Sequence, residues 1–283
     1  MLKIENKTFP NERDLYGFND IHLINCAFTG PEDGESALKE SSNVKVESCL
    51  FDLRYPFWHV DVVEISQCKM TEKCRAALWY SRHIKINNST LHGVKALREC
   101  EDIHIQNSDV LSPEFGWRCK DVKIVDSTLE GEYLLFQTSG ICWENVRFKG
   151  KYSFQYTNDV KIENCNLDTK DAFWHSKNVT VKNTVIKGEY LGWYSENLTL
   201  INCKIIGTQP LCYCRNLKLI DCEMVDADLS FEYSDVDATI KGEILSVKNP
   251  KSGSIVADYI KETILTEDSK YKCNCKIIER SLK

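Results

Sequence analysis

A cassette of ten residues recurs along most of this 283-residue chain. Each copy combines a polar start, an alternation of apolar and polar residues, and a small residue that in most copies follows Asn or Asp. The copies read NDIHLINCAF (19–28), SNVKVESCLF (42–51), DVVEISQCKM (61–70), RHIKINNSTL (82–91), EDIHIQNSDV (101–110), KDVKIVDSTL (120–129), SGICWENVRF (139–148), NDVKIENCNL (158–167), KNVTVKNTVI (177–186), ENLTLINCKI (196–205) and RNLKLIDCEM (215–224). From position 82 to position 215 every step is 19 residues, and the three earlier steps are 23, 19 and 21 residues.

A fixed period near 20 residues is typical of a solenoid, because so small a unit buries its apolar side chains only by stacking on its neighbours. Leucine-rich repeats have a similar period but need the spacing LxxLxLxxN. The cassettes instead show the alternation of a β-strand, as in Val44-Lys45-Val46-Glu47, and are rich in β-branched residues. The sequence therefore predicts an all-β fold, a right-handed parallel β-helix of about eleven to twelve coils with three short strands in each coil.

The repeat also predicts how the chain is organised. We expect one continuous domain with an N-terminal cap over residues 1–18, β-helix coils over 19–233, and final irregular coils with a C-terminal cap over 234–283. The last segment is expected to add two or three strands, a turn at KNPKSG and a short helix around 257–264.

Stacked coils place equivalent residues in columns. One column holds Asn or Asp at a bend, where these residues tolerate a left-handed backbone: Asn25, Asn88, Asn107, Asp126, Asn145, Asn164, Asn183, Asn202 and Asp221. The next position is small and includes Cys in six copies, which explains part of the 14 cysteines. Because nothing indicates export, we expect free and mostly buried thiols rather than disulfides.

A column of large residues lies in the predicted third strand. It is expected to face the core, because the flanking columns would otherwise bury seven formal charges whereas this column holds one. The column is Trp58, Trp79, Arg98, Trp117, Phe136, Gln155, Trp174, Trp193, Cys212 and Phe231. The same alternation predicts an apolar stripe on the outer surface, made of Phe57, Leu78, Leu97, Leu135, Phe154, Phe173 and Leu211.

A long exposed apolar stripe is typical of a ligand groove, a partner interface, or a surface covered by another segment, here residues 234–283. We favour a carbohydrate-binding protein of unknown specificity, in which sugar rings stack on exposed aromatic side chains. The predicted ligand-binding residues are Phe154, Tyr156, Phe173, His175, Tyr190 and Tyr194.

Two alternatives remain open at this point. The first is a polysaccharide lyase or glycosidase that uses Arg118, Glu114 and Glu99, although no column brings two acids together on neighbouring coils. The second is a structural or interaction scaffold, with the stripe as the interface of a homo-oligomer. The sequence alone does not decide whether the protein is an enzyme.

The amino-acid composition excludes several classes of binding partner. The net charge of −6, with no basic run, argues against nucleic acid. No segment has the roughly 20 consecutive apolar residues of a membrane helix, and we expect a soluble, cytoplasmic protein. The Cys212/Cys214 and Cys273/Cys275 pairs lack further ligands for zinc, so no metal is predicted. The common nucleotide, hydrolase and metalloprotease motifs are absent, and no cofactor is predicted.

The cassettes, together with GEILSVKNPKSGSIVAD (242–258), resemble the bacterial family catalogued as domain of unknown function 3737. The resemblance covers essentially the whole chain. It implies a pectate-lyase-like, single-stranded right-handed parallel β-helix and a relation to carbohydrate-active proteins. It assigns no catalytic residue, and fold-level analogy is a weak guide to function.

Overall fold

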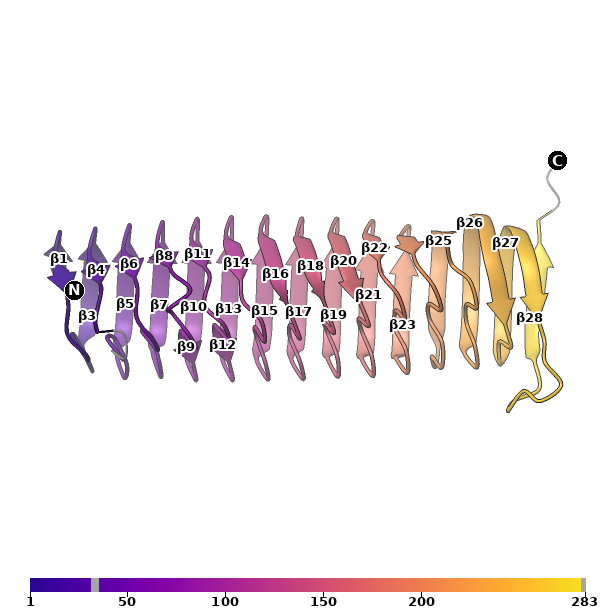
Figure 1. The fold of residues 1–283 in the computed structure, drawn as a ribbon, viewed down its shortest axis with the longest axis horizontal. Helices are drawn as coiled ribbons and strands as arrows, with labels where there is room; N and C mark the ends of the chain where they lie inside the picture. Colours follow the sequence, from indigo (N-terminus) through magenta and orange to yellow (C-terminus); the bar gives the residue numbers. More distant parts are fainter. Residues whose placement is uncertain (32–35, 281–283) are drawn as a thin grey trace. The chain divides into compact units, whose positions relative to one another are not determined.

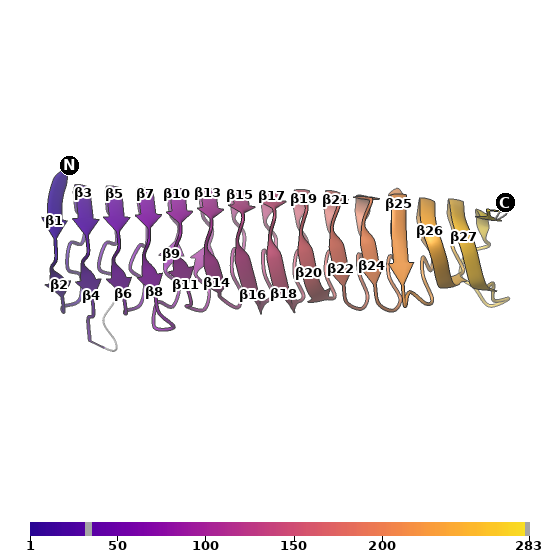
Figure 2. The same cartoon turned by 90° about the horizontal axis from the view of Figure 1, so that it is seen from above.

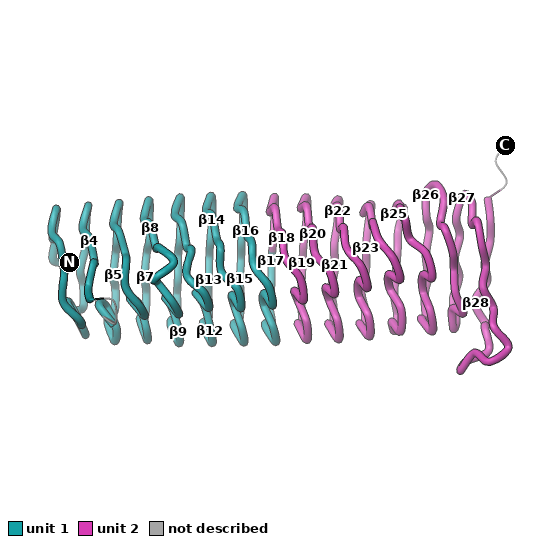
Figure 3. Tube along the Cα trace, in the orientation of Figure 1, with its two compact units in different colours: residues 1–142 teal, residues 143–283 magenta. Residues whose placement is uncertain are grey.

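The computed structural model describes residues 1–31 and 36–280, and this part of the chain contains no α-helix. The chain divides into two compact units, residues 1–142 and residues 143–283 (Figure 3). Each unit is a parallel β-solenoid, and together they contain about 14 turns at a spacing of roughly 19 residues. The predicted fold class is therefore confirmed, with more turns than the eleven to twelve expected. Within the described ranges no helix has the length and apolar character needed to cross a membrane.

Unit 1 has two rows of strands, visible in Figures 1 and 2. The row of longer strands contains β1 (Leu2–Glu5), β3 (Asn19–Ile24), β5 (Ser42–Glu47), β7 (Asp61–Ser66), β10 (Arg82–Asn87), β13 (Glu101–Gln106) and β15 (Lys120–Val125). The second row contains β2 (Thr8–Phe9), β4 (Ala27–Phe28), β6 (Leu50–Phe51), β8 (Lys69–Met70), β11 (Thr90–Leu91), β14 (Asp109–Leu111) and β16 (Thr128–Glu132). The third segment of the coil contributes β9 (Leu78–Trp79) and β12 (Leu97–Arg98). The division between the units falls within β17 (Ser139–Glu144).

Unit 2 continues the same pattern and then changes to longer strands. Its first row contains β19 (Asn158–Glu163), β21 (Lys177–Lys182) and β23 (Glu196–Ile201), and its second row contains β18 (Arg147–Lys151), β20 (Asn166–Lys170), β22 (Val185–Lys187) and β24 (Lys204–Ile206). The long strands are β25 (Leu217–Val225), β26 (Asp235–Lys248), β27 (Ser252–Ile264) and β28 (Asn274–Glu279). β25 pairs with both β23 and β24, so one strand replaces the two of the earlier coils.

The segments at the two ends of the chain do not match the cassette sequence, but their strands still stack on the neighbouring coils. β1 and β2 pair in parallel with β3 and β4, so residues 1–18 contain one more pair of stacked strands. Two or three strands were expected after residue 233, and the structure has three, with the turn at KNPKSG between β26 and β27. The short helix expected around 257–264 is wrong, because this segment belongs to β27 and pairs with β26.

The alternation of apolar and polar residues explains why the cassettes form the longer strands. Ile84 and Ile86 of β10 are fully buried, whereas Lys85 between them is exposed. In register, Ile84 pairs with Val63 and Ile86 with Ile65, so like side chains stack inside unit 1. Burial of such side chains contributes about 1.5–3 kcal/mol each, which is the main reason that coils of this size are stable when stacked.

The predicted Asn and Asp column adopts the expected backbone. All nine residues have φ between 48° and 55°, in the left-handed region. Their side chains also connect successive coils, as when Asn202 Nδ2 donates to Asn183 Oδ1 at 2.9 Å. A second left-handed column, at the second position of the cassette, was not predicted; Asn197 donates in the same way to Asn178 at 3.0 Å.

The small-residue column lies in the core as predicted. The backbone N–H of Cys26 donates to Cys49 Sγ, and that of Cys49 to Cys68 Sγ, both at 3.4 Å. All 14 cysteines are free thiols; 11 are buried and three, Cys142, Cys273 and Cys275, are half-buried.

The predicted orientation of the third segment is wrong. Phe57, Leu78, Leu97, Leu135, Phe154, Phe173 and Leu211, expected on the outer surface, are all 0% exposed. In the column expected to be core, the eight residues from Trp58 to Trp193 are half-buried on the outside, and Cys212 and Phe231 are buried. No exposed apolar stripe exists at these positions, and an oligomer interface built on it has no basis.

The reason is the backbone of the third segment, which is a turn rather than a strand in most coils. Tyr152, Phe154 and Tyr156 all have φ of 56–57°, so left-handed residues alternate with ordinary ones. A left-handed residue redirects the side chains that follow it, and the two-residue alternation of a strand no longer holds. Phe154 therefore points into the core, and Tyr156 points out.

The tryptophan column has a structural role outside the core. The indole rings of Trp174 and Trp193 stack with centroids 5.3 Å apart, on neighbouring coils as predicted. Each indole Nε1–H donates to a backbone carbonyl, Trp174 to Tyr190 O at 2.7 Å and Trp193 to Gln209 O at 2.8 Å. In unit 1, Arg98 takes the place of an indole and lies between the rings of Trp79 and Trp117, 4.5 and 4.7 Å from their centroids.

Candidate functional site

A column of stacked rings runs along the third segments of unit 2. It consists of Tyr156, His175 and Tyr194, which are exposed, and Tyr213, which is half-buried; we call it the aromatic ladder. Successive ring centroids are 4.8, 4.9 and 4.7 Å apart, and the ring planes differ by 5–10°. The left-handed backbone at each of these residues directs its side chain outward, and the spacing of the coils stacks the rings.

The ladder itself does not offer a stacking platform for sugars. Each inner ring has a parallel neighbour on both faces, so ligands reach ring edges, hydroxyl groups and imidazole nitrogens rather than ring faces. These edges form a row of hydrogen-bonding groups with one group per coil. A ring face becomes available only where the parallel stacking ends.

The parallel stacking ends at Tyr213. The ring of Tyr233 lies 5.8 Å from Tyr213 at an interplanar angle of 63°, and the ring of Tyr271 lies 5.4 Å from Tyr233 at 80°. The far face of Tyr213 therefore has no parallel ring over it. A depression with a volume of about 500 Å³ lies here, within the range of about 300–1,000 Å³ typical of ligand pockets. We call it the tyrosine–lysine pocket; it is lined by His175, Tyr194, Tyr213, Arg215, Tyr233, Asp235, Lys251, Lys270 and Tyr271.

One wall of this pocket comes from the loop between β27 and β28, which projects beyond the neighbouring turns of unit 2 (Figure 1). The loop is attached to the coils by the backbone N–H of Lys270, which donates to the Tyr233 hydroxyl at 3.3 Å. The amines of Lys251 and Lys270 lie 5.6 and 5.3 Å from the centroid of the Tyr271 ring. The loop thus brings one tyrosine and one lysine to the end of the ladder.

Two groups in the pocket have shifted pKa values. Burial, and next the negative charge of Glu232, raise the pKa of Tyr213 to about 12, so this phenol stays neutral at physiological pH and can donate and accept hydrogen bonds. Burial opposes ionisation of Asp235, but hydrogen bonds from Ser252 and Lys251 outweigh it and lower the pKa of this carboxyl. Asp235 is therefore an ionised partner that holds Lys251 at 3.0 Å.

The predicted ligand-binding residues fall into three groups. Phe154 and Phe173 are completely buried and cannot contact a ligand, so these two predictions are wrong. Tyr156 and Tyr194 are 50% and 44% exposed, and together with His175 they belong to the ladder. Tyr190 lies to the side of the ladder, against the ring of Trp193 at 5.3 Å.

The repeat pattern does not predict the tyrosine–lysine pocket. The column that contains Tyr194 leads by one more repeat to Tyr213, which was a usable signal. No periodic signal places Tyr271 or Lys270 beside it, because both lie in a loop outside the repeats.

The structure separates the three catalytic candidates. Arg118 lies 3.5 Å from Glu99, and both line a shallow depression of about 370 Å³ in unit 1. Glu114 does not line it and instead contacts Lys95 at 3.3 Å and Arg98 at 3.2 Å. Each carboxylate is thus already paired with a cation, and the two acids do not converge on one space.

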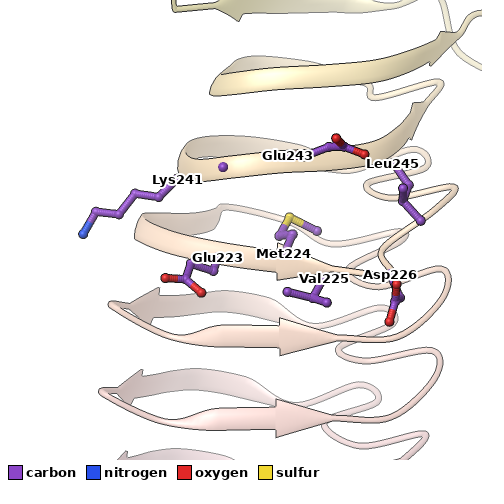
Figure 4. Close-up of a pocket in the computed structure, with 8 residues that line it drawn as sticks. Glu223, Met224, Val225, Asp226, Lys241, Glu243 and Leu245 are labelled. Atoms are coloured by element: carbon purple, nitrogen blue, oxygen red, sulfur yellow. The ribbon is translucent and has the colours of Figure 1, made fainter. Parts of the chain in front are cut away.

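A third depression, of about 350 Å³, lies beside β25 and β26 in unit 2 (Figure 4). It accompanies the register shift between β26 and β27, which occurs between Ile240 and Glu243. In Figure 4 the Lys241 side chain extends away from those of Glu243 and Asp226. The polar groups here do not converge, so we do not regard this depression as the functional site.

A buried carboxylate lies away from these depressions. Asp171 is 5% exposed, and burial raises its pKa. On the next coil Glu189 is held by Lys170 at 2.8 Å. Among the described residues there is no group of three or more His, Cys, Asp or Glu side chains arranged to hold a metal ion.

Comparison with known proteins identifies the family but not the activity. No curated protein matches the chain in sequence. Two similar solved structures are the catalytic domain of a GH87 alpha-1,3-glucanase in complex with nigerose (8% identity, TM-score 0.21) and a periplasmic alginate epimerase (8% identity, TM-score 0.21). The matches cover 99% and 98% of this chain but only 64% and 74% of those proteins, and they are too weak to transfer a substrate or a reaction. The family model described as "Protein of unknown function (DUF3737)" matches residues 2–278, and the chain belongs to this family.

Proposed function

We propose that this protein binds a carbohydrate chain at the tyrosine–lysine pocket, with the saccharide extending along the aromatic ladder. The main support is the change of ring orientation at Tyr213. Carbohydrate-binding sites need an aromatic face for the apolar side of a sugar and polar groups for its hydroxyls, and the pocket has both. The ring of Tyr213, which has a parallel neighbour on one face only, provides the first, and the hydroxyl of Tyr233 and the amines of Lys251 and Lys270 provide the second.

The ladder extends this site by one polar edge per coil. Its rings are spaced at 4.7–4.9 Å, so a saccharide lying along it would meet a hydroxyl or an imidazole nitrogen at regular intervals. Edges of this kind bind through hydrogen bonds that compete with water, and each contributes only about 0.5–1.5 kcal/mol. We therefore place most of the affinity in the pocket and assign the ladder an orienting role.

A glycan array, followed by isothermal titration calorimetry on the full chain, tests this proposal. We expect at least one class of oligosaccharide to bind. Tyr213→Ala and Tyr271→Ala should each weaken binding about tenfold or more, because loss of an aromatic contact costs about 1–3 kcal/mol. Tyr259→Ala is the matched control, since Tyr259 is 48% exposed on β27 but does not line the pocket. Absence of binding to any saccharide, or equal binding by all three variants, would refute the proposal.

The alternative of a polysaccharide lyase or glycosidase has less support. Its candidates Glu99 and Glu114 lie in separate ion pairs, whereas glycosidases place two carboxyl groups on either side of one bond. Assays on neutral and acidic polysaccharides would revive this alternative if Arg118→Ala abolished an activity of the folded protein.

A further inference from the structure

The tyrosine–lysine pocket is positively charged although the chain as a whole is acidic. Arg215, Lys251 and Lys270 line it together with one carboxylate, Asp235, while the formal net charge of the chain is −6. A basic site on an acidic protein does not reflect the average surface. Cations gathered in a concave site raise the local concentration of anionic ligands.

The three cations are not equally engaged. Lys251 is paired with Asp235 at 3.0 Å, and the Arg215 side chain, which is 70% exposed, reaches Glu196 at 3.4 Å. Lys270 has no carboxylate partner within the described ranges 1–31 and 36–280; its amine lies over the Tyr271 ring. An exposed amine held over a ring keeps most of its capacity to bind an anion, because the ring contact uses none of its three N–H donors.

We propose that the ligand of this pocket is an anionic saccharide, with Lys270 as the main contact of its acidic group and Lys251 and Arg215 as supporting charges. This inference rests on the proposed carbohydrate-binding function and adds the charge class of the ligand. A sugar ring that contacts Tyr213 in this pocket would have its substituents beside the loop that carries Lys270 and Tyr271, because all three residues line the same depression. The acidic group is a carboxylate, as in a uronic acid, or a sulfate ester; both present anionic oxygens to the same amines.

Calorimetry with a matched pair of probes tests the charge of the ligand. The first probe is a hexamer of α-1,4-linked galacturonic acid, and the second is the same hexamer with every carboxylate methyl-esterified. A heparin-derived hexasaccharide distinguishes sulfate from carboxylate, and maltohexaose represents neutral sugars. We expect at least one anionic probe to bind about tenfold or more tightly than the ester and the neutral sugar, with affinity falling as salt rises.

Substitutions of single lysine residues test which side chain binds the acidic group of the ligand. Lys270→Met should weaken binding of the preferred anionic probe about fivefold and reduce its salt dependence, while the methyl ester is unaffected. Lys187→Met is the control, because Lys187 is exposed on β22 in the same unit but does not line the pocket. Polyglutamate, which carries charge but no sugar, should not compete.

The outcomes separate the two proposals. If the methyl ester or maltohexaose binds as tightly as the anionic probes, the charge inference is wrong and carbohydrate binding stands. Unchanged binding by Lys270→Met, or full competition by polyglutamate, also overturns the inference. If no saccharide of any charge binds, both proposals fail.

Discussion

Single residues in this protein are constrained mainly by the left-handed backbone that the turns of each coil require. The second position of the cassette shows this well: Asp20, Asn43, His83 and Asp102 have φ of 51–55° there, and Asn and Asp accept this conformation at low cost. Val62 occupies the same position with φ of 59°. A β-branched residue is strained in this region, because its branched side chain crowds the backbone.

Val62→Asn is therefore expected to stabilise the protein by about 1 kcal/mol. Val62 is 41% exposed, so little buried apolar area is lost, and the new amide could join the contact between Asn43 and Asp20. Urea denaturation measures the change. Val94→Asn is the control, because Val94 is 40% exposed but does not have a positive φ, and its substitution should change the free energy of unfolding by less than about 0.5 kcal/mol. Equal effects of the two substitutions would contradict the strain argument.

Asp171 makes stability depend on pH. Burial raises its folded-state pKa above the ordinary value of 3.8, so the folded state binds this proton more tightly than the unfolded state. Its contribution is most favourable below pH 3.8, and it declines as the pH rises from there through the folded-state pKa. Asp171→Asn resembles the protonated form, so it should raise the free energy of unfolding at pH 7. Thermal unfolding of both proteins at pH 3.5 and pH 7 would detect this, and a gain of equal size at both values would exclude the explanation.

Among the structural elements, each coil is held to the next by contacts that the sequence repeat predicts only in part. The cassette strands pair through backbone hydrogen bonds and buried aliphatic side chains. The third segments are also joined by backbone hydrogen bonds, as when the N–H of Tyr194 donates to Cys212 O at 3.2 Å. Side-chain donors of the tryptophan column add further bonds to carbonyl groups of the following coil. Gln155 does the same as the indoles, donating to Asp171 O at 3.3 Å, which indicates that the N–H donor matters as well as the ring.

Trp193→Phe should therefore destabilise unit 2 by about 1–2 kcal/mol. The phenyl ring keeps part of the stacking on Trp174 but removes the indole donor at 2.8 Å from the carbonyl of Gln209, which retains only the weak Cys212 Sγ donor at 3.6 Å. Chemical denaturation gives the free energy of unfolding, and Tyr194→Phe serves as the control because it removes only an exposed hydroxyl. A loss no larger than that of the control would show that the indole N–H is dispensable.

For the molecule as a whole, the reactivity of the cysteine thiols shows whether both units are folded. Native protein should react with Ellman's reagent at no more than three thiols, Cys142, Cys273 and Cys275, because only these are half-buried. Burial, followed by the nearby Cys273, raises the pKa of Cys275 to about 11, so this thiol should react most slowly of the three. All 14 should react in denaturant. Rapid reaction of more than three thiols in the native protein would contradict the packing of the small-residue column.

The architecture was accessible from the sequence because its signals are local. Alternation in each cassette predicted the strands, and the Asn and Asp residues marked the left-handed bends. The orientation of the third segment was not accessible in the same way. Charge burial predicts which column faces the core only if side chains alternate every two residues, and left-handed residues such as Phe154 and Phe173 invert the expected directions. Aromatic residues give no local sign that they will adopt this backbone.

For a related reason, the sequence predicts only part of the candidate site. Tyr194 and Tyr213 follow the period, but Lys270 and Tyr271 reach the pocket because a nonrepeating loop folds back onto Tyr233. The stacking of coils and the columns of equivalent residues follow directly from the repeat, since a 19-residue unit can bury its apolar side chains only against its neighbours. Which columns face outward, and where the parallel stacking of rings ends, could be seen only in the folded protein. Both features depend on backbone conformations and loop contacts that are set between coils rather than within a single coil.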